Sequence, residues 1–261
     1  MKRLLFVSLK GGCGSTTVAA NLAQALVKIN KQVLAIEVVP NSLLQTHLGL
    51  PQEEQDGWAK QLLSDKPWTQ AGYESPQGAL FLPFGHLNSE QLKAFFFFNE
   101  RSHYLSMLGE MTLQVSENCG EQWLLFHADL AELTDPEVRS FVDSMDMIVV
   151  VVTADALSYL TLQSWLQHEE LSRLLRSDKL RFLVNKYQPE TEIGRDFMLV
   201  LKKELSESLI PVSIHRDTAL LECVANLTTV QHYSPSSQAT KDFQSFAFWC
   251  VSALSSAQDQ S

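Results

Sequence analysis

Apolar residues gather along this chain in short runs that do not alternate with polar residues. Runs such as residues 4–9 and 147–152 have the length of a strand and are apolar on both faces. This is typical of a parallel sheet that is covered on both sides. The sequence predicts strands at residues 4–9, 33–39, 79–83, 123–127, 147–152, 180–185 and 211–214.

Apolar residues at helical spacing occupy most of the intervals between these runs. Val18, Leu22, Leu26 and Ile29 recur every three or four residues, so residues 16–29 are predicted to form a helix between the first two strands. A strand, a helix and a second strand form a βαβ unit, which implies a parallel sheet. Further helices are predicted at residues 43–48, 57–63, 90–109, 135–144, 157–175, 193–206 and 238–254.

These elements predict an α/β fold with a mostly parallel central sheet flanked by helices on both faces. No linker or internal repeat interrupts the pattern, so residues 1–254 are expected to form a single domain. The polar tail, residues 255–261, is expected to be disordered. The four phenylalanines at 95–98 cannot all face one side of a helix. Two interpretations stay open for them, partial burial in the core or a partner or dimer surface.

Composition and charge narrow the functional classes. The chain has 261 residues, 45% of them hydrophobic, and a net charge of -10. No nucleic acid partner is expected, because phosphate backbones are bound by basic surfaces, although a local basic patch stays compatible with this composition. No apolar stretch reaches the roughly 18 residues that span a bilayer, so no membrane insertion is expected. The cysteines lack metal-ligand spacing and are expected to be reduced thiols of a cytoplasmic protein: Cys13, Cys119, Cys223 and Cys250.

A glycine-rich loop connects the first predicted strand to the first predicted helix. The P-loop pattern is G-x-x-x-x-G-K-[ST]. Its glycines let backbone N–H groups converge on the phosphates, its lysine contacts the β and γ phosphates, and its hydroxyl binds magnesium. Ser15 stands here where that lysine is expected, so the strict pattern fails. A structural turn that has lost its ligand is the alternative. The predicted phosphate-binding residues are Lys10, Gly11, Gly12, Cys13, Gly14, Ser15, Thr16 and Thr17.

The string from Lys10 to Thr17 resembles the K-G-G-x-G-K-[ST]-T signature of the ParA/MinD group, which belongs to the SIMIBI class of P-loop NTPases. The resemblance implies ATP and Mg2+ as ligands. It implies that Lys10 reaches across a homodimer interface to the partner's nucleotide, that Thr16 binds magnesium and that Thr17 contacts the α-phosphate.

The base end of the site is expected after the later strands. Asn185 resembles the adenine-reading asparagine of the group, and an amide offers the donor and acceptor that an adenine edge requires. A strand-end asparagine that caps a turn is the alternative. Arg216 and Asp217 line the base pocket or a dimer interface, or form a surface ion pair.

Several stretches resemble one branch of this group, the BcsQ family of bacterial cellulose biosynthesis. That resemblance implies an ATP-dependent assembly or regulatory factor of the cellulose synthase secretion complex, at the cytoplasmic face of the inner membrane. It also implies a nucleotide-sandwich dimer and a small BcsR-type partner. Ser15 is expected in this branch. The resemblance is carried by Pro-Asn-Ser-Leu-Leu at 40–44, Gly-Trp-Ala at 57–59, Leu-Pro-Phe-Gly at 82–85, Ile-His-Arg-Asp at 214–217, Glu222-Cys223 and Trp249-Cys250.

The hydrolytic residues depart from the ParA/MinD pattern. The second strand of that group ends D-x-D-P, and here Glu37 and Val39 hold the acidic positions. His127 follows the apolar run where an aspartate is expected, and Asp129 comes two residues later. Glu37 and Asp129 are candidate magnesium ligands, Asp129 only if the strand extends that far. His127 either approaches the nucleotide or is a structural residue. Because valine cannot orient water, we expect weak or absent hydrolysis.

Two other functions fit the same signature. A ParA-type partition ATPase needs DNA-binding basic residues and a hydrolytic cycle, which the net charge of -10 and Val39 disfavour. A MinD-like membrane switch ends in a basic amphipathic helix, whereas this chain has no Lys or Arg after Lys241.

Overall fold

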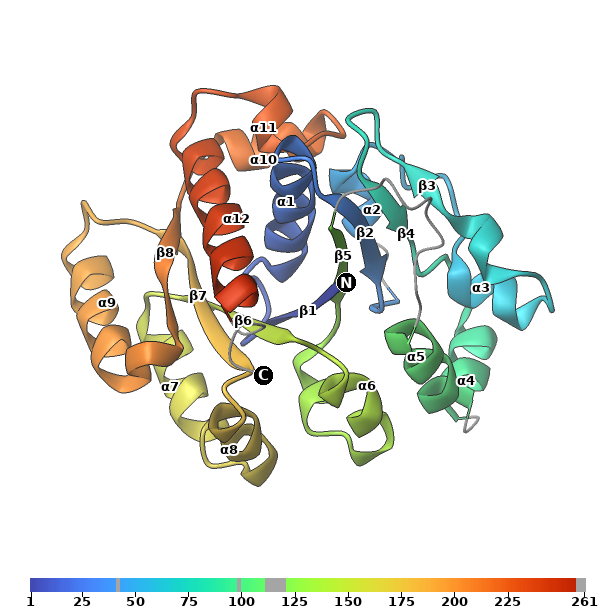
Figure 1. Cartoon of the computed structure of the whole chain (residues 1–261), viewed down its shortest axis with the longest axis horizontal. Helices are drawn as coiled ribbons and strands as arrows, with labels where there is room; N and C mark the ends of the chain where they lie inside the picture. The colour runs from blue at the N-terminus through green and yellow to red at the C-terminus, as the bar shows by residue number, and fades with distance from the viewer. Residues whose placement is uncertain (41–42, 98–99, 111–120, 257–261) are drawn as a thin grey trace.

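A mostly parallel sheet of eight described strands forms the centre of the computed structural model, which describes residues 1–40, 43–97, 100–110 and 121–256 (Figure 1). The strand order is β3-β4-β2-β5-β1-β6-β7-β8, and every pair is parallel except β3 with β4. This confirms the predicted fold class. The strands are β1 (Lys2–Ser8), β2 (Gln32–Glu37), β3 (Tyr73–Glu74), β4 (Leu80–Leu82), β5 (Gln122–His127), β6 (Met147–Thr153), β7 (Leu180–Tyr187) and β8 (Leu209–His215).

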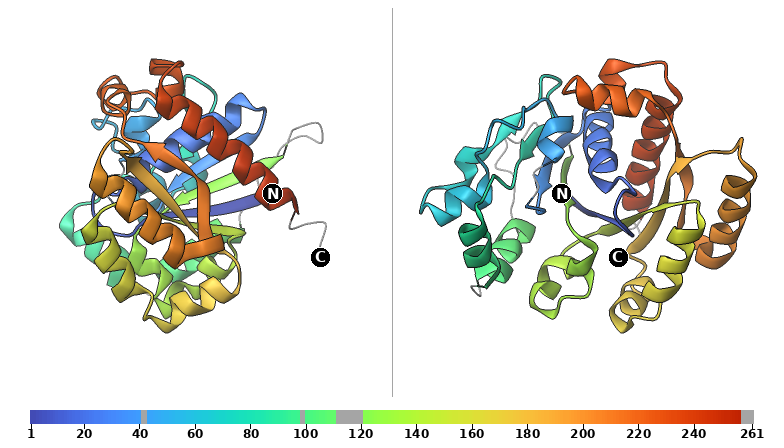
Figure 2. Two further views of the ribbon diagram at one scale, coloured as in Figure 1. Left: turned by 90° about the vertical axis from the view of Figure 1, so that its left-hand side faces the viewer. Right: turned by 180° about the vertical axis from the view of Figure 1, so that it is seen from behind.

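Helices cover both faces of the sheet (Figures 1 and 2). The face nearer α1 (Ser15–Lys28) also carries α10 (Ala219–Ala225), α11 (Val230–Tyr233) and α12 (Gln238–Ser256). The opposite face carries α4 (Ser89–Phe97), α5 (Glu100–Glu110), α6 (Arg139–Asp143), α7 (Ala156–Trp165) and α8 (Glu169–Arg176). The α2 helix (Leu44–His47) packs beside α1, whereas α3 (Trp58–Leu63) and α9 (Glu192–Leu205) lie toward opposite ends of the sheet.

The two ends of the described chain lie close together. The Lys2 side chain, at the start of β1, donates a hydrogen bond from Nζ to the backbone oxygen of Leu254 at 2.6 Å, near the end of α12. The start of β1 and the end of α12 lie side by side in Figure 2. The α12 helix includes residues 255 and 256, which the sequence assigned to a disordered tail. The rest of the predicted tail, residues 257–261, lies outside the described residues.

The structure corrects two predicted helices. Residues 90–109 were expected to form one helix, but α4 ends at Phe97 and α5 begins at Glu100. Residues 157–175 likewise form α7 and α8. Helix α8 begins with Glu169 and Glu170. Negative charges stabilise a helix N-terminus, so these residues favour the start of a separate helix here. Strand β3 and helices α10 and α11 were not predicted from the sequence.

The phenylalanine run is divided between core and surface. Phe95 is buried, and its ring lies 5.6 Å from that of Trp58 and 5.2 Å from that of Phe84. Phe96 is 45% exposed and lies under the guanidinium of Arg101. The side chain of residue 97 and all of residue 98 fall outside the described part of the chain. Phe95 therefore belongs to the core.

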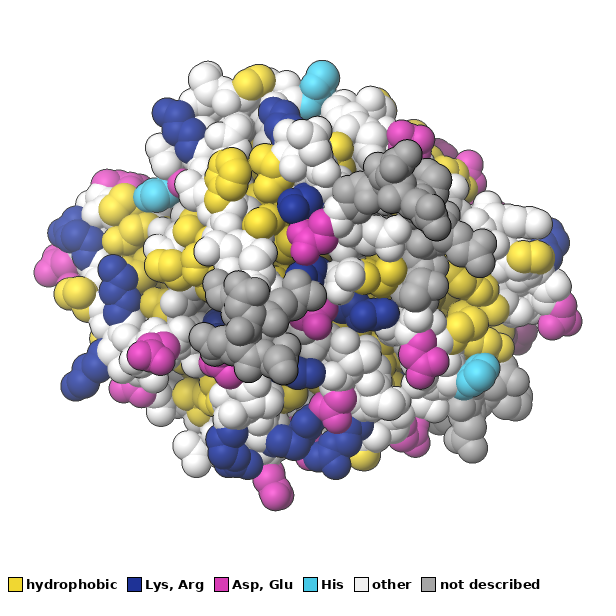
Figure 3. All heavy atoms as spheres, in the orientation of Figure 1, with side chains coloured by type: hydrophobic (Ala, Val, Ile, Leu, Met, Phe, Trp, Pro, Cys, Tyr) yellow, Lys and Arg dark blue, Asp and Glu magenta, His cyan; other side chains and the backbone are white. Residues whose placement is uncertain are grey.

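Charges of both signs share the visible surface. Lys and Arg side chains are interspersed with Asp and Glu on the face shown in Figure 3. Within the described ranges, no helix is both long and apolar enough to cross a membrane.

Candidate nucleotide-binding site

The loop after β1 lies at the centre of the sheet edge, between two cavities. The larger has a volume of about 940 Å3 and is lined by Gly14, Thr17, Asn185 and Arg216, among others. The smaller, about 480 Å3, is lined by the other predicted site residues: Lys10, Gly11, Gly12, Ser15, Thr16, Glu37 and Asp129. The structure thus brings all of them to these two walls except Cys13, which is buried beneath the loop.

Two glycines in the loop hold backbone conformations that side chains rarely adopt. Gly12 has φ 82° and Gly14 has φ 94°. A Cβ atom on Gly14 would lie 2.7 Å from Nδ2 of Asn185, whereas one on Gly11 or Gly12 would meet nothing within 4 Å. The loop therefore leaves open space beside its first glycines and is tightly enclosed at the start of α1, where the first-turn N–H groups lack intrahelical partners.

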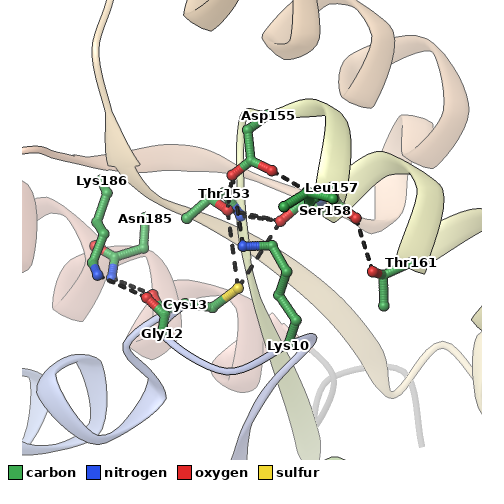
Figure 4. Close-up of polar contacts among 10 residues, drawn as sticks. All are labelled: Lys10, Gly12, Cys13, Thr153, Asp155, Leu157, Ser158, Thr161, Asn185 and Lys186. Carbon is green, nitrogen blue, oxygen red and sulfur yellow. Dashed lines mark hydrogen bonds and ion pairs between the residues drawn. The ribbon is translucent and has the colours of Figure 1, made fainter.

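Residues from β7 hold the loop from the side of the larger cavity (Figure 4). Asn185 donates from Nδ2 to the backbone oxygen of Cys13 at 2.7 Å, and Lys186 donates from Nζ to that of Gly12 at 2.7 Å. The Oδ1 atom of Asn185 is buried and has no hydrogen-bond partner among the described residues. Lys186 was not predicted as a site residue. Its place directly after Asn185, at the loop end of the strand, was the available signal.

Lys10 lies beside an acidic residue of its own chain. Its Nζ is 3.7 Å from Oδ2 of Asp155, which caps α7 by accepting the N–H of Ser158 (Figure 4). Burial alone raises the pKa of Asp155, but hydrogen bonds from Thr153 and Ser158 and the charge of Lys10 outweigh it and leave that pKa below its usual range. Asp155 is therefore an ionised partner for Lys10 within one chain.

The His127 ring lines the smaller cavity. The parallel register of β2 with β5 sets Glu37 beside His127. Nδ1 of His127 lies 2.6 Å from Oε1 of Glu37, and Nε2 lies 2.8 Å from Oγ of Ser15 and 3.2 Å from Oγ1 of Thr16. Both ring nitrogens therefore have partners within the protein, and the ring touches the phosphate loop.

Glu37 and His127 form a buried pair. Glu37 is 1% exposed, and its second oxygen accepts the backbone N–H of Leu44 at 3.0 Å. Burial lowers the pKa of His127, but the charges of Glu37 and Asp129 and the hydrogen bond that the imidazole donates to Glu37 outweigh it and raise that pKa above the usual value. Both carboxylate oxygens of Glu37 therefore already have partners within the protein.

The three predicted magnesium ligands, Thr16, Glu37 and Asp129, all line the smaller cavity, and two of them already contact His127. Strand β5 ends at His127, so it does not extend to Asp129, which is exposed on the cavity wall. The oxygens of Glu37 already accept protein hydrogen bonds, and His127 lies on the Thr16 hydroxyl. Among the residues that the structure describes, no group of three His, Cys, Asp or Glu side chains is arranged to hold a metal ion.

A second histidine, His47, was missed from the sequence. It comes from α2, lines the larger cavity, and places Nε2 3.4 Å from Oγ1 of Thr17. Burial, and then the charge of His127, lowers the pKa of His47 to about 4. Its imidazole is therefore neutral near pH 7, beside the residue predicted to contact the α-phosphate.

Arg216 and Asp217 both line the larger cavity but do not pair with each other. Arg216 donates to Oε1 of Gln188, and Asp217 accepts the N–H groups of Ala219 and Ala239. Arg216 thus lines the same cavity as Gly14, Thr17 and Asn185.

Comparison with known proteins agrees with this geometry. Residues 1–251 match the profile of a family described as cellulose biosynthesis protein BcsQ. The chain belongs to the BcsQ family. It is 28% identical over 246 residues to BcsQ of Salmonella typhimurium strain LT2, a match that covers 93% of this chain and 91% of that protein. It is 26% identical over 247 residues to BcsQ of Escherichia coli K12, with the same coverage of 93% and 91%.

The fold of this chain is similar to that of a solved structure. The septum site-determining protein MinD of Pyrococcus horikoshii, complexed with Mg-ADP, matches with a TM-score of 0.66 at 19% identity and covers 94% of both chains. This likeness confirms the ParA/MinD type of P-loop fold for this BcsQ-family chain.

Proposed function

We propose that this BcsQ-family chain is an ATP-binding assembly or regulatory factor of a bacterial cellulose synthase secretion complex, with weak or absent hydrolysis. The observation that carries the proposal is a phosphate loop with its open glycine cradle beside a cavity wall on which valine and a Glu37–His127 pair replace free acids. Family membership supports the cellulose role. The same resemblance supports a cytoplasmic location at the inner-membrane face, where a BcsR-type protein is the proposed small partner.

The larger cavity suits an adenine nucleotide. Its volume, about 940 Å3, is of the size that ligand pockets have. Asn185 lines this cavity, and its Oδ1 is buried without a hydrogen-bond partner among the described residues. A buried acceptor without a partner is costly unless a ligand donates to it. The exocyclic amino group of adenine is such a donor, whereas guanine carries a carbonyl oxygen at that ring position. We therefore propose ATP in preference to GTP.

Turnover is proposed to be slow because the attacking water has no orienting carboxylate. Val39 lines the smaller cavity where the family pattern has its second acid, and Glu37 is engaged by His127 and Leu44. Removing one group that stabilises the transition state costs roughly 100-fold or more in rate.

The proposed active form is a nucleotide-sandwich homodimer. Lys10 lies on the wall of the smaller cavity, and its ion pair with Asp155 is longer than a close hydrogen-bonded pair, at 3.7 Å, with both side chains partly exposed. Such a pair contributes little stability. Breaking the Lys10–Asp155 ion pair, so that Lys10 can contact a partner's nucleotide, therefore costs little free energy.

A nucleotide-content assay with a turnover assay tests this function. The purified full chain, alone and with a BcsR-type partner, is expected to retain intact ATP and to release phosphate at least about 100-fold more slowly than a ParA-type ATPase measured beside it. Turnover comparable to that ATPase, and abolished by Lys10→Ala, would contradict slow hydrolysis. Absence of bound nucleotide under all conditions would contradict the binding role itself.

The Asn185→Ala variant tests the adenine contact. We expect ATP affinity to fall about tenfold, the equivalent of about 1.4 kcal/mol, because the variant loses the hydrogen bonds to the base and to the Cys13 carbonyl. We also expect the preference for ATP over GTP to shrink, as measured by titration calorimetry with each nucleotide. Asn226→Ala is the control, since Asn226 is exposed and lines neither cavity. An unchanged ATP-to-GTP ratio in Asn185→Ala would remove Asn185 from base recognition.

A further inference from the structure

We propose that this chain binds the phosphates of its nucleotide without a divalent metal, because the His127 imidazole lies between Thr16 and Glu37, two of the three residues that the sequence predicts as magnesium ligands. The proposal rests on the nucleotide-binding role inferred above and departs from the magnesium site expected from the sequence.

The position of the ring carries the inference. Its two nitrogens reach the Thr16 hydroxyl at 3.2 Å and the Glu37 carboxylate at 2.6 Å. A magnesium ion sits about 2.0–2.1 Å from each oxygen ligand and requires near-octahedral space around it. An ion joining Thr16 to Glu37 would therefore overlap the imidazole, which is itself buried to 7% exposure.

The ring is not free to turn away. Glu37 holds Nδ1 on one side, and its other oxygen fixes the N–H of Leu44 at the start of α2. The Trp58 indole in turn donates to the Glu37 backbone oxygen at 2.8 Å. Moving the carboxylate to a metal would leave Nδ1 of the buried imidazole and the buried N–H of Leu44 without partners, at a cost of about 1–3 kcal/mol for each group.

Groups of the chain itself remain to attract the phosphates. Lys10 lines the smaller cavity, and Lys186 lines the larger cavity. The first turn of α1 directs its N–H groups and dipole toward the loop, which favours an anion. The loop therefore keeps an electrostatic basis for phosphate binding that needs no metal ion.

Titration calorimetry with ATP, in buffer containing Mg2+ and in buffer containing EDTA, tests this with the full wild-type chain. We expect the two affinities to agree within about threefold. Metal analysis of the nucleotide-loaded protein after gel filtration is expected to find less than stoichiometric magnesium. Binding that requires Mg2+, or stoichiometric bound magnesium, overturns the inference and leaves the nucleotide-binding role standing. Binding in neither buffer overturns the nucleotide-binding role, and the inference with it.

The His127→Asp variant supplies the converse test. A carboxylate in place of the ring, beside Glu37 and Thr16, frees space and adds a ligand, so ATP binding is expected to become at least about tenfold weaker in EDTA than in Mg2+. His103→Asp is the matched control, because His103 is exposed on α5 and lines neither cavity. Equal affinities of His127→Asp in both buffers contradict the assignment. The metal analysis of the wild-type chain decides the question should that variant fail to fold.

Discussion

Replacing Gly14 with alanine is expected to lower the affinity for ATP by roughly a hundredfold, the equivalent of about 2.7 kcal/mol. Gly14 has φ 94°, where a side chain is strained, and the new Cβ would lie 2.7 Å from Nδ2 of Asn185. Asn185 would have to leave the Cys13 carbonyl that it holds, so the loop and the proposed base contact would be disturbed together. Titration calorimetry with ATP measures the loss.

A matched glycine controls for this prediction. Gly72 has φ -78°, and a Cβ there would lie 3.5 Å from the backbone oxygen of Thr69, which is an ordinary contact. Gly72→Ala is expected to leave ATP affinity and thermal stability nearly unchanged. If Gly14→Ala binds ATP as the wild type does, the loop does not hold the phosphates in the manner proposed.

Replacing Trp58 with alanine is expected to lower the free energy of unfolding by about 3–5 kcal/mol. The indole is fully buried, its ring lies 5.3 Å from that of Phe84, and its Nε1 donates to the Glu37 backbone oxygen. The variant leaves a cavity and an unpaired buried carbonyl beside the site. Chemical denaturation followed by circular dichroism measures the change.

Two further tryptophan variants separate packing from the hydrogen bond. Trp58→Phe retains much of the buried volume but lacks the N–H, so its loss is expected to be smaller, about 1–3 kcal/mol. Trp68→Ala removes a tryptophan that is only half-buried, and we expect it to destabilise the chain less than Trp58→Ala. Equal losses for Trp58→Ala and Trp68→Ala would show that Trp58 has no special role beneath the site.

Features read over short stretches could be predicted from the sequence. The buried strands and α1 follow from runs and spacings of a few residues, and they specify a parallel sheet with a phosphate loop after β1. The loop glycines were identifiable because their pattern and their conformation lie in the same few residues. Breaks within long helical stretches, as at residues 166–168, depend on small local balances and were not predicted.

What surrounds the loop depends on contacts between distant segments. His127 and Glu37 are 90 residues apart, and they meet because packing sets the register of β2 with β5. The strand ends at His127, so the histidine and not Asp129 faces Ser15 and Thr16. His47 reaches Thr17 from α2 for a similar reason.

The sequence by itself therefore determined the α/β fold, the phosphate loop and the loss of the usual acids, because each is written in neighbouring residues. Only the tertiary structure decided that His127 stands between Thr16 and Glu37, that Asn185 lines the larger cavity with its Oδ1 unpartnered among the described residues, and that Lys10 lies beside Asp155. The physical reason is that the packing of the whole core sets the strand register and the cavity walls. No single stretch of sequence contains the information that determines this packing.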